Sequence, residues 1–90
     1  MKANFKNIRV EVAFDEFKEL DIAKQFGNYI HSHTPDIGLD DVAREIYHSE
    51  GAVEIPEIYI ENIVELVLDS QCMFVAAVKK AIIKTLKPQE

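Results

Sequence analysis

The side chains best suited to metal or acid–base chemistry are three histidines, His31, His33 and His48, together with Asp36. Imidazole and carboxylate groups bind zinc and similar ions. Side chains two residues apart on a helix point about 200° apart, so His31 and His33 converge only if the helix ends before Pro35. The chain also lacks the HExxH, CxxC, GxxxxGKS/T and GxSxG motifs. We therefore expect surface histidines, with a metal site as the weaker alternative, and we predict neither a cofactor nor an enzyme activity.

Cys72 is the single cysteine and the clearest candidate nucleophile. It begins an uncharged apolar run, where the start of a helix would activate the thiol. No companion polar triad is evident, so we expect a small buried hydrophobic side chain. One cysteine forms no internal disulfide, and the first residues lack the apolar segment of a secretory signal. Both features predict a cytoplasmic protein.

Charged residues are grouped by sign in the second half of the chain. Acidic residues recur every four positions and form a stripe on one predicted helix face: Glu57, Glu61, Glu65 and Asp69. Basic residues follow near the C-terminus: Lys79, Lys80, Lys84 and Lys87. These groups are either solvated faces, with the lysines complementing the negative end of a helix dipole, or a docking stripe for a basic partner.

The charge balance argues against nucleic acid and membrane partners. Sixteen acidic and ten basic residues give a net charge of −6, which repels phosphate backbones and anionic lipid headgroups. The longest uncharged apolar run, residues 72–78, is far shorter than the ~20 residues that span a bilayer. Ala23 and Gly27 resemble the spacing of a helix-turn-helix, but the next predicted helix, 40–49, offers only Arg44 to bases or phosphates. We predict a protein partner, and a nucleic-acid-associated regulator that uses the C-terminal lysines is the alternative.

Residues 7–14 alternate in the pattern of a half-buried strand. The residues expected on its buried face are Ile8, Val10, Val12 and Phe14. A strand needs a partner for its backbone groups, and the two candidates are the short stretch 52–55 and the same strand of a second chain. Residues 15–20 are expected to form a short turn of helix.

Three helical segments follow. The first, 22–32, is capped by Asp21, and the second, 40–49, is capped by Asp40 or Asp41 and ended by Gly51. From Pro56 to Leu86 no glycine or proline intervenes, so this segment is either one long helix or two helices separated at Asp69-Ser70. We favour the break, because a rod would project beyond a domain of this size. Two apolar residues one turn apart, Val78 and Ile82, are predicted to lie in the core.

The length of 90 residues and the hydrophobic content of 48% predict one globular domain over 1–90. We expect a mainly α fold with a minor β element, an N-terminal strand followed by about four helices, the last two forming an apolar hairpin. Because the apolar surface of 57–86 is wide, we also predict a homodimer. Its candidate interface residues are Ile58, Tyr59, Ile63 and Leu66. The predicted function is a non-catalytic protein interaction or oligomerisation module.

Overall fold

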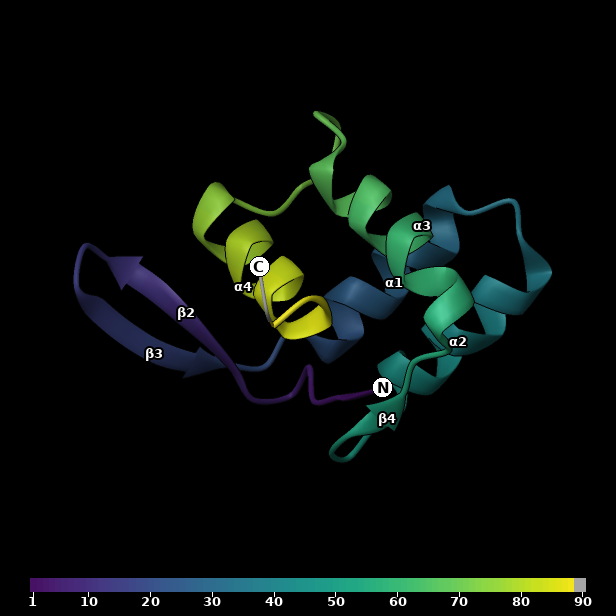
Figure 1. Cartoon of the computed structure of the whole chain (residues 1–90), viewed down its shortest axis with the longest axis horizontal. Helices are drawn as coiled ribbons and strands as arrows, with labels where there is room; N and C mark the ends of the chain where they lie inside the picture. Colours follow the sequence, from purple (N-terminus) through teal and green to yellow (C-terminus); the bar gives the residue numbers. More distant parts are fainter. Residues whose placement is uncertain (89–90) are drawn as a thin grey trace.

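Four helices and four short strands make up the structure, a computed structural model that describes residues 1–88. In chain order they are β1 (Lys2–Ala3), β2 (Ile8–Ala13), β3 (Glu16–Leu20), α1 (Ala23–His33), α2 (Ile37–Tyr47), β4 (Val53–Glu54), α3 (Glu57–Leu68) and α4 (Ala76–Leu86). The helices form the body, and the strands form two small antiparallel sheets (Figure 1). The predicted mainly α fold with a minor β element is confirmed. Residues 89 and 90 of the predicted domain lie outside the described residues.

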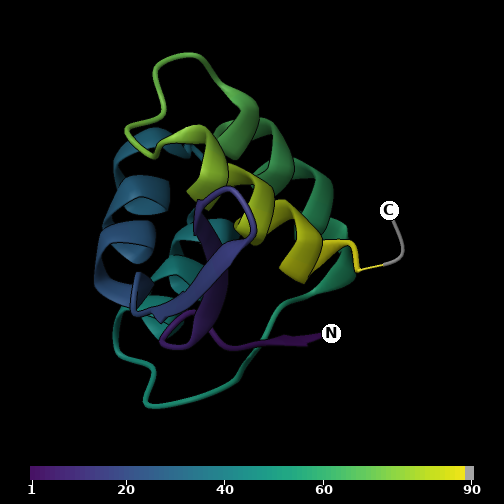
Figure 2. The same cartoon turned by 90° about the vertical axis from the view of Figure 1, so that its left-hand side faces the viewer.

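β2 and β3 form a β-hairpin that projects from the helices (Figure 1), and in Figure 2 it lies in front of them. Ala13 pairs with Glu16, so the chain reverses over Phe14 and Asp15. Asp15 has a φ of 64°, a left-handed conformation that aspartate tolerates better than most residues. The register shifts between Glu11 and Ala13, as in a β-bulge. The strand predicted at 7–14 is therefore present as β2.

The helical turn predicted over residues 15–20 is wrong, because this segment is strand β3. A single turn of helix is costly to nucleate in isolation. Once the chain has reversed at Asp15, β2 supplies a full ladder of hydrogen bonds to the same residues. The neighbouring strand therefore decides the conformation of this segment over its weak local preference.

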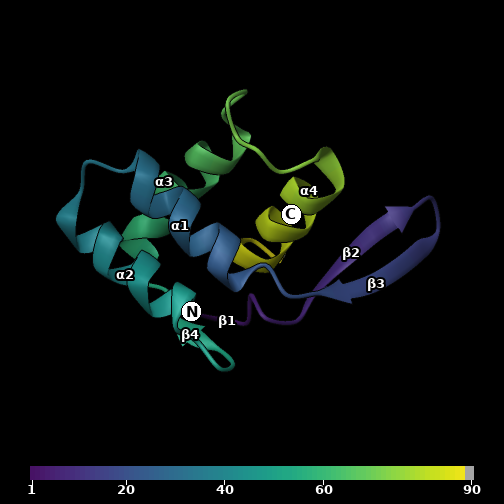
Figure 3. The same cartoon turned by 180° about the vertical axis from the view of Figure 1, so that it is seen from behind.

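Residues 52–55, one of the two partners considered for the strand at 7–14, do not pair with it, because β2 pairs with β3. β4 pairs with β1 instead, with Ala3 opposite Val53. The Ile55 backbone N–H donates to the Met1 carbonyl at 2.6 Å, and the Met1 amino group donates to the Ile55 carbonyl at 3.0 Å. The N-terminus consequently lies beside β4, as Figure 3 shows. A two-residue strand carries no periodic pattern, which is why the sequence did not indicate β1.

α1 and α2 pack antiparallel along their lengths. A Cβ on Gly27 would lie 2.8 Å from the Ala43 carbonyl oxygen and 2.9 Å from Tyr47 Cβ, so glycine permits this close approach. Nearer the connection between the helices, the His31 ring contacts the Asp40 carboxylate. These contacts describe an αα-hairpin, whereas a helix-turn-helix crosses at about 90–120°. The packing therefore gives no support to DNA reading by this pair.

The ends of α2 differ from those predicted. Asp36 caps the helix, since its Oδ1 accepts hydrogen bonds from the backbone N–H groups two and three residues later, at 2.8 and 3.3 Å. Asp40 and Asp41, the predicted caps, lie within the helix. The helix ends at Tyr47, so Gly51 lies in the following loop and does not end it. At α1 the predicted cap is also wrong, because the N-cap position is Ile22 and no side chain caps the helix. The Asp21 carboxylate, one residue earlier, accepts only from the Ala23 backbone N–H at 3.2 Å.

The apolar segment after Pro56 divides into two helices that pack on each other, as predicted. α3 ends at Leu68, and α4 begins at Ala76. Asp69 does not cap α4, because its carboxylate accepts instead from the Gln71 backbone N–H at 2.8 Å within the connecting loop. The loop lets α4 turn back toward the hairpin (Figure 1).

The core draws side chains from all four helices, from β1 and β2, and from the loops around Phe5 and Ile55. Val78 and Ile82 belong to it, which confirms their predicted burial. The rings of Phe5 and Phe26 are tilted against each other, with 4.8 Å between their centroids, and Phe74 lies edge-on to Phe26 at 6.1 Å. The last two helices thus contribute to a core that all four helices share.

Candidate functional site

A groove of about 950 Å³ runs between the hairpin and α4. It is larger than a second hollow, of about 160 Å³, between α1 and α2. Five of its lining residues come from β2 and its turn, one from β3 and six from α4. The lining residues are Arg9, Glu11, Val12, Ala13, Phe14, Phe17, Ala76, Ala77, Lys80, Ala81, Lys84 and Thr85. We call this hollow the hairpin groove.

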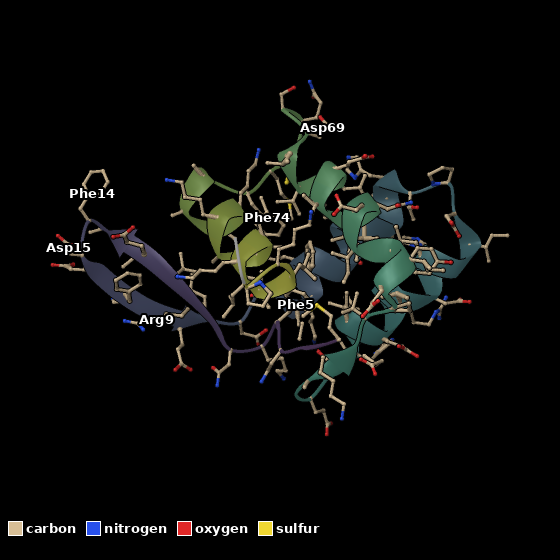
Figure 4. All side chains as sticks on the ribbon, viewed as in Figure 1. Phe5, Arg9, Phe14, Asp15, Asp69 and Phe74 are labelled. Carbon is tan, nitrogen blue, oxygen red and sulfur yellow. The ribbon has the colours of Figure 1, made fainter. Side chains whose placement is uncertain are left out.

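The hairpin wall of the groove carries large apolar side chains that the body does not cover. Phe14 is 95% exposed at the tip of the hairpin, where Figure 4 shows it pointing away from the protein. Phe17 is 48% exposed, and Val12 is similarly open. The side chains on the opposite wall are mostly small, since α4 contributes three alanines to the groove. Large side chains facing small ones leave an apolar hollow that a partner side chain can fill.

The rim of the groove is basic in an otherwise acidic protein. Lys80 and Lys84 are exposed on α4, and neither has an ion-pair partner within residues 1–88. The Arg9 guanidinium lies 4.3 Å from the centroid of the Phe17 ring, a cation–π contact that orders both side chains. Glu11, the one acidic residue of the lining, accepts a hydrogen bond from the Asp15 backbone N–H at 2.9 Å. The lining therefore has three cationic side chains and one carboxylate, and that carboxylate already accepts a hydrogen bond. This balance of charge favours a ligand with negative charge.

The histidines lie apart from the hairpin groove. His31 and His48 line a small hollow of about 160 Å³ between α1 and α2, together with Asp40 and Arg44. His33 instead bonds through Nδ1 to the Tyr29 carbonyl at 2.8 Å. Within residues 1–88, no three His, Cys, Asp or Glu side chains are grouped so as to hold a metal ion. The structure therefore does not bring the three histidines together.

Cys72 is buried, as expected, and lies against Tyr29. The Tyr29 hydroxyl donates to the Leu66 carbonyl at 2.6 Å. Burial raises the pKa of Tyr29 from 10.0 to about 12, and the hydrogen bond and charge interaction with Cys72 and the charge of Asp69 add to the shift. This cluster ties α1 to the end of α3.

The acidic stripe is exposed along the whole length of α3. One of its members, Glu61, forms an ion pair with Lys87. The stripe lines neither the hairpin groove nor the hollow between α1 and α2. The four predicted lysines do not form one patch, because Lys79 donates to the Asp69 carbonyl at 3.2 Å and only Lys80 and Lys84 line the groove.

The four candidate interface residues differ in accessibility. Ile58 is 77% exposed, and Tyr59 and Leu66 are half-buried. Ile63 is fully buried at 0% exposure, so its selection as an interface residue was wrong. α3 and its neighbours cover Ile63 within one chain, and no second copy is needed to cover it.

Sequence reasoning missed the hairpin groove. Phe14 was expected on a buried face, yet the hairpin extends beyond the body at that point. An available signal was the pair of short alternating runs on either side of Phe14 and Asp15, which is typical of a hairpin. In comparisons with known proteins, no family model, curated protein or solved structure gave a significant match to the chain. The described residues include no helix with the length and apolarity required to cross a membrane.

Proposed function

We propose that the protein is a non-enzymatic binding module that holds a segment of a protein partner in the hairpin groove. The observation that carries the proposal is the combination of exposed aromatic side chains with basic side chains around one hollow. Buried aromatic anchors and charged rims are typical of protein interaction sites. The cytoplasmic location and the protein partner predicted from the sequence belong to the same proposal.

The chemistry of the groove defines the partner segment. Apolar side chains of the partner would fill the space between Phe17 and the alanines of α4. Its carboxylates would face Lys80 and Lys84. A nucleic acid fits less well, because the protein has a net charge of −6. Its overall repulsion of a phosphate backbone outweighs the attraction of a few lysines. The occupant is therefore an acidic segment with apolar residues.

Selection from a random peptide library displayed on phage tests this function, because it needs no identified partner. We expect the wild-type protein to select peptides rich in acidic and apolar residues. The double variant Lys80→Glu and Lys84→Glu should bind them roughly tenfold more weakly or worse, because two attractive contacts become repulsive. Phe17→Ser should weaken binding as well, since it removes the apolar wall.

The matched control is the double variant Lys2→Glu and Lys24→Glu. It makes the same change in net charge at two exposed lysines that do not line the groove. Binding that falls equally in both double variants would show an effect of net charge alone. A selection whose peptides are unaffected by the changes at Lys80, Lys84 and Phe17 would refute the proposed site.

A further inference from the structure

We infer that the segment held in the hairpin groove is α3 of a second copy of this chain. The inference rests on the proposed function and identifies the partner of the same site. α3 is incompletely covered within one chain, and its exposed face has the charge and the apolar side chains that the groove favours.

α3 is less well covered within the chain than α1. Eight of its twelve residues are aliphatic or aromatic, and only three of these are buried, namely Ile63, Val64 and Val67. Every aliphatic and aromatic side chain of α1 is buried by comparison. Among the five uncovered residues of α3, Ile58 is 77% exposed and Leu68 is 62% exposed. Uncovered apolar side chains grouped on one helix are typical of a surface that another molecule covers.

The exposed face of α3 is both acidic and apolar. The acidic stripe runs along it, and Ile58 and Leu68 lie among the carboxylates. Ile58 is three residues from Glu61, and Leu68 is three residues from Glu65. Residues three apart are neighbours on the surface of a helix. The chain itself therefore carries a segment of the composition that the groove favours in its occupant.

The charges on the two surfaces also agree in spacing. Lys80 and Lys84 are four residues apart on α4, and the acidic residues of the stripe recur at the same interval. Four residues correspond to ~6 Å along a helix axis. When a second α3 lies alongside α4, two successive carboxylates of the stripe can therefore face the two lysines. Neither lysine has an ion-pair partner within residues 1–88 that would compete for it.

The groove receives side chains of the second α3 and not the whole helix. α4 already packs against β2, so the incoming helix lies across the mouth of the groove. An exposed apolar side chain such as Leu68 then fills the space between Phe17 and the alanines of α4. The carboxylates stay at the basic rim, where water still reaches them and where opposite charges select the partner.

The positions of the two surfaces permit a closed dimer. α3 packs on α4, and both helices lie on the side of the molecule that faces the reader in Figure 1. The groove and the acidic stripe therefore occupy adjoining surfaces of one chain. A two-fold axis between two copies would place each α3 at the groove of the other, so that both contacts form together.

Reversing the charge of each surface and then mixing the variants tests this pairing. Lys80→Glu with Lys84→Glu makes the groove rim acidic, and Glu57→Lys with Glu65→Lys reverses two charges of the stripe. In light scattering at tens of micromolar, each variant alone should have the chain mass of 10.3 kDa, because like charges then meet at both contacts. An equimolar mixture should have twice that mass, because both contacts of the mixed dimer join opposite charges.

Two further variants complete the test. Glu45→Lys with Glu50→Lys is the matched control for the stripe, because it makes the same change in net charge at two exposed residues outside both surfaces. This control should keep the doubled mass of the wild type. Leu68→Ser should shift the wild-type protein toward the chain mass, since it removes an apolar side chain that the groove would bury. Circular dichroism checks that every variant is folded.

The outcomes separate this inference from the proposed function. A wild-type chain that stays at 10.3 kDa overturns the second copy as the occupant. A doubled mass that persists in both charge variants overturns it as well, because the dimer then uses other surfaces. A mixture of folded variants that stays at the chain mass overturns the pairing of stripe and groove.

The peptide selection reads the groove independently of self-association. Selected peptides that depend on Lys80, Lys84 and Phe17 leave the binding function standing when the second copy fails as the occupant. The absence of such peptides, together with a wild-type protein at the chain mass, overturns both proposals.

Discussion

At the scale of single residues, the five phenylalanines divide into two groups with different roles. Phe5 and Phe26 are fully buried and Phe74 packs against Phe26, so these three stabilise the core. Phe14 and Phe17 are exposed on the hairpin, where they contribute little to folding. Apolar groups left in water in this way are more often binding groups than structural ones. The hairpin groove depends on this division.

The core role of Ile82 gives the first prediction. It is 0% exposed, so Ile82→Ala should lower the free energy of unfolding by about 2–5 kcal/mol. The matched control is Ile58→Ala, which makes the same truncation at a residue that is 77% exposed, and it should change stability by less than about 0.5 kcal/mol. Urea denaturation of both variants measures the difference. Equal stability of the two variants would contradict the assigned positions.

Tyr29 gives a prediction about alkaline pH. Its pKa is about 12 in the folded protein against 10.0 when unperturbed, so between these values the unfolded chain loses the phenol proton while the folded chain keeps it. The free energy of unfolding should therefore fall as the pH rises from about 10 to 12.

The variant Tyr29→Phe is the control for the alkaline effect. It should be less stable at neutral pH by about 0.5–1.5 kcal/mol, because the hydrogen bond to the Leu66 carbonyl is lost. Its stability should fall less steeply above pH 10 than that of the wild type. Parallel pH profiles of the two proteins would show that Tyr29 does not titrate with a raised pKa.

At the scale of elements, each strand forms because another strand lies beside it, and the helices are stabilised by groups at their ends. β3 forms because β2 lies beside it, and β1 forms because β4 lies beside it. α2 illustrates the helix ends, since Asp36 satisfies two backbone N–H groups that would otherwise have no acceptor. α1 and α2 then approach closely at Gly27, which has no Cβ.

The cap of α2 gives the third prediction. Asp36→Ala should destabilise the protein by about 1 kcal/mol, the usual cost of losing an aspartate cap. Asp41→Ala is the matched control, because it removes a carboxylate that is exposed within the same helix. Thermal unfolding should show a lower midpoint for the first variant only. A larger loss of stability in Asp41→Ala than in Asp36→Ala would contradict the cap at Asp36 and support the helix start predicted from the sequence.

At the scale of the whole molecule, the fold covers most of the apolar surface that led us to predict a homodimer. The radius of gyration is 12.2 Å, close to the ~12 Å expected of a compact chain of this length. The break between α3 and α4 places Ile63, Val67 and Ile82 in one core. The large apolar residues that stay exposed lie chiefly on the hairpin and near the ends of α3, with Ile58 and Leu68 among the latter.

Self-association stays a prediction, and the structure gives it a specific form. The acidic stripe of one copy has the charge that the hairpin groove of another copy would attract. Light scattering at tens of micromolar should then give twice the chain mass of 10.3 kDa, and Lys80→Glu with Lys84→Glu should return it to 10.3 kDa. A mass of 10.3 kDa for the wild type would exclude the homodimer and leave the groove to a different protein.

The sequence by itself determined the helices, one long strand and the break after Leu68. These features follow from local periodicity and from chain breakers, which act within one element. Val78 and Ile82 were predicted in the core for the same reason, because an apolar stripe identifies the buried face of its own helix.

Only the tertiary structure decided which strands pair, how far the hairpin projects and what lines the groove. Strand partners depend on contacts between distant residues, as Ala3 and Val53 show. The exposure of Phe14 depends on where the body ends, and a periodic pattern carries no information about that boundary. The sequence presented Lys80 and Lys84 as a solvated face or as possible contacts to nucleic acid, and they became part of the hairpin groove only because the fold sets α4 against β2.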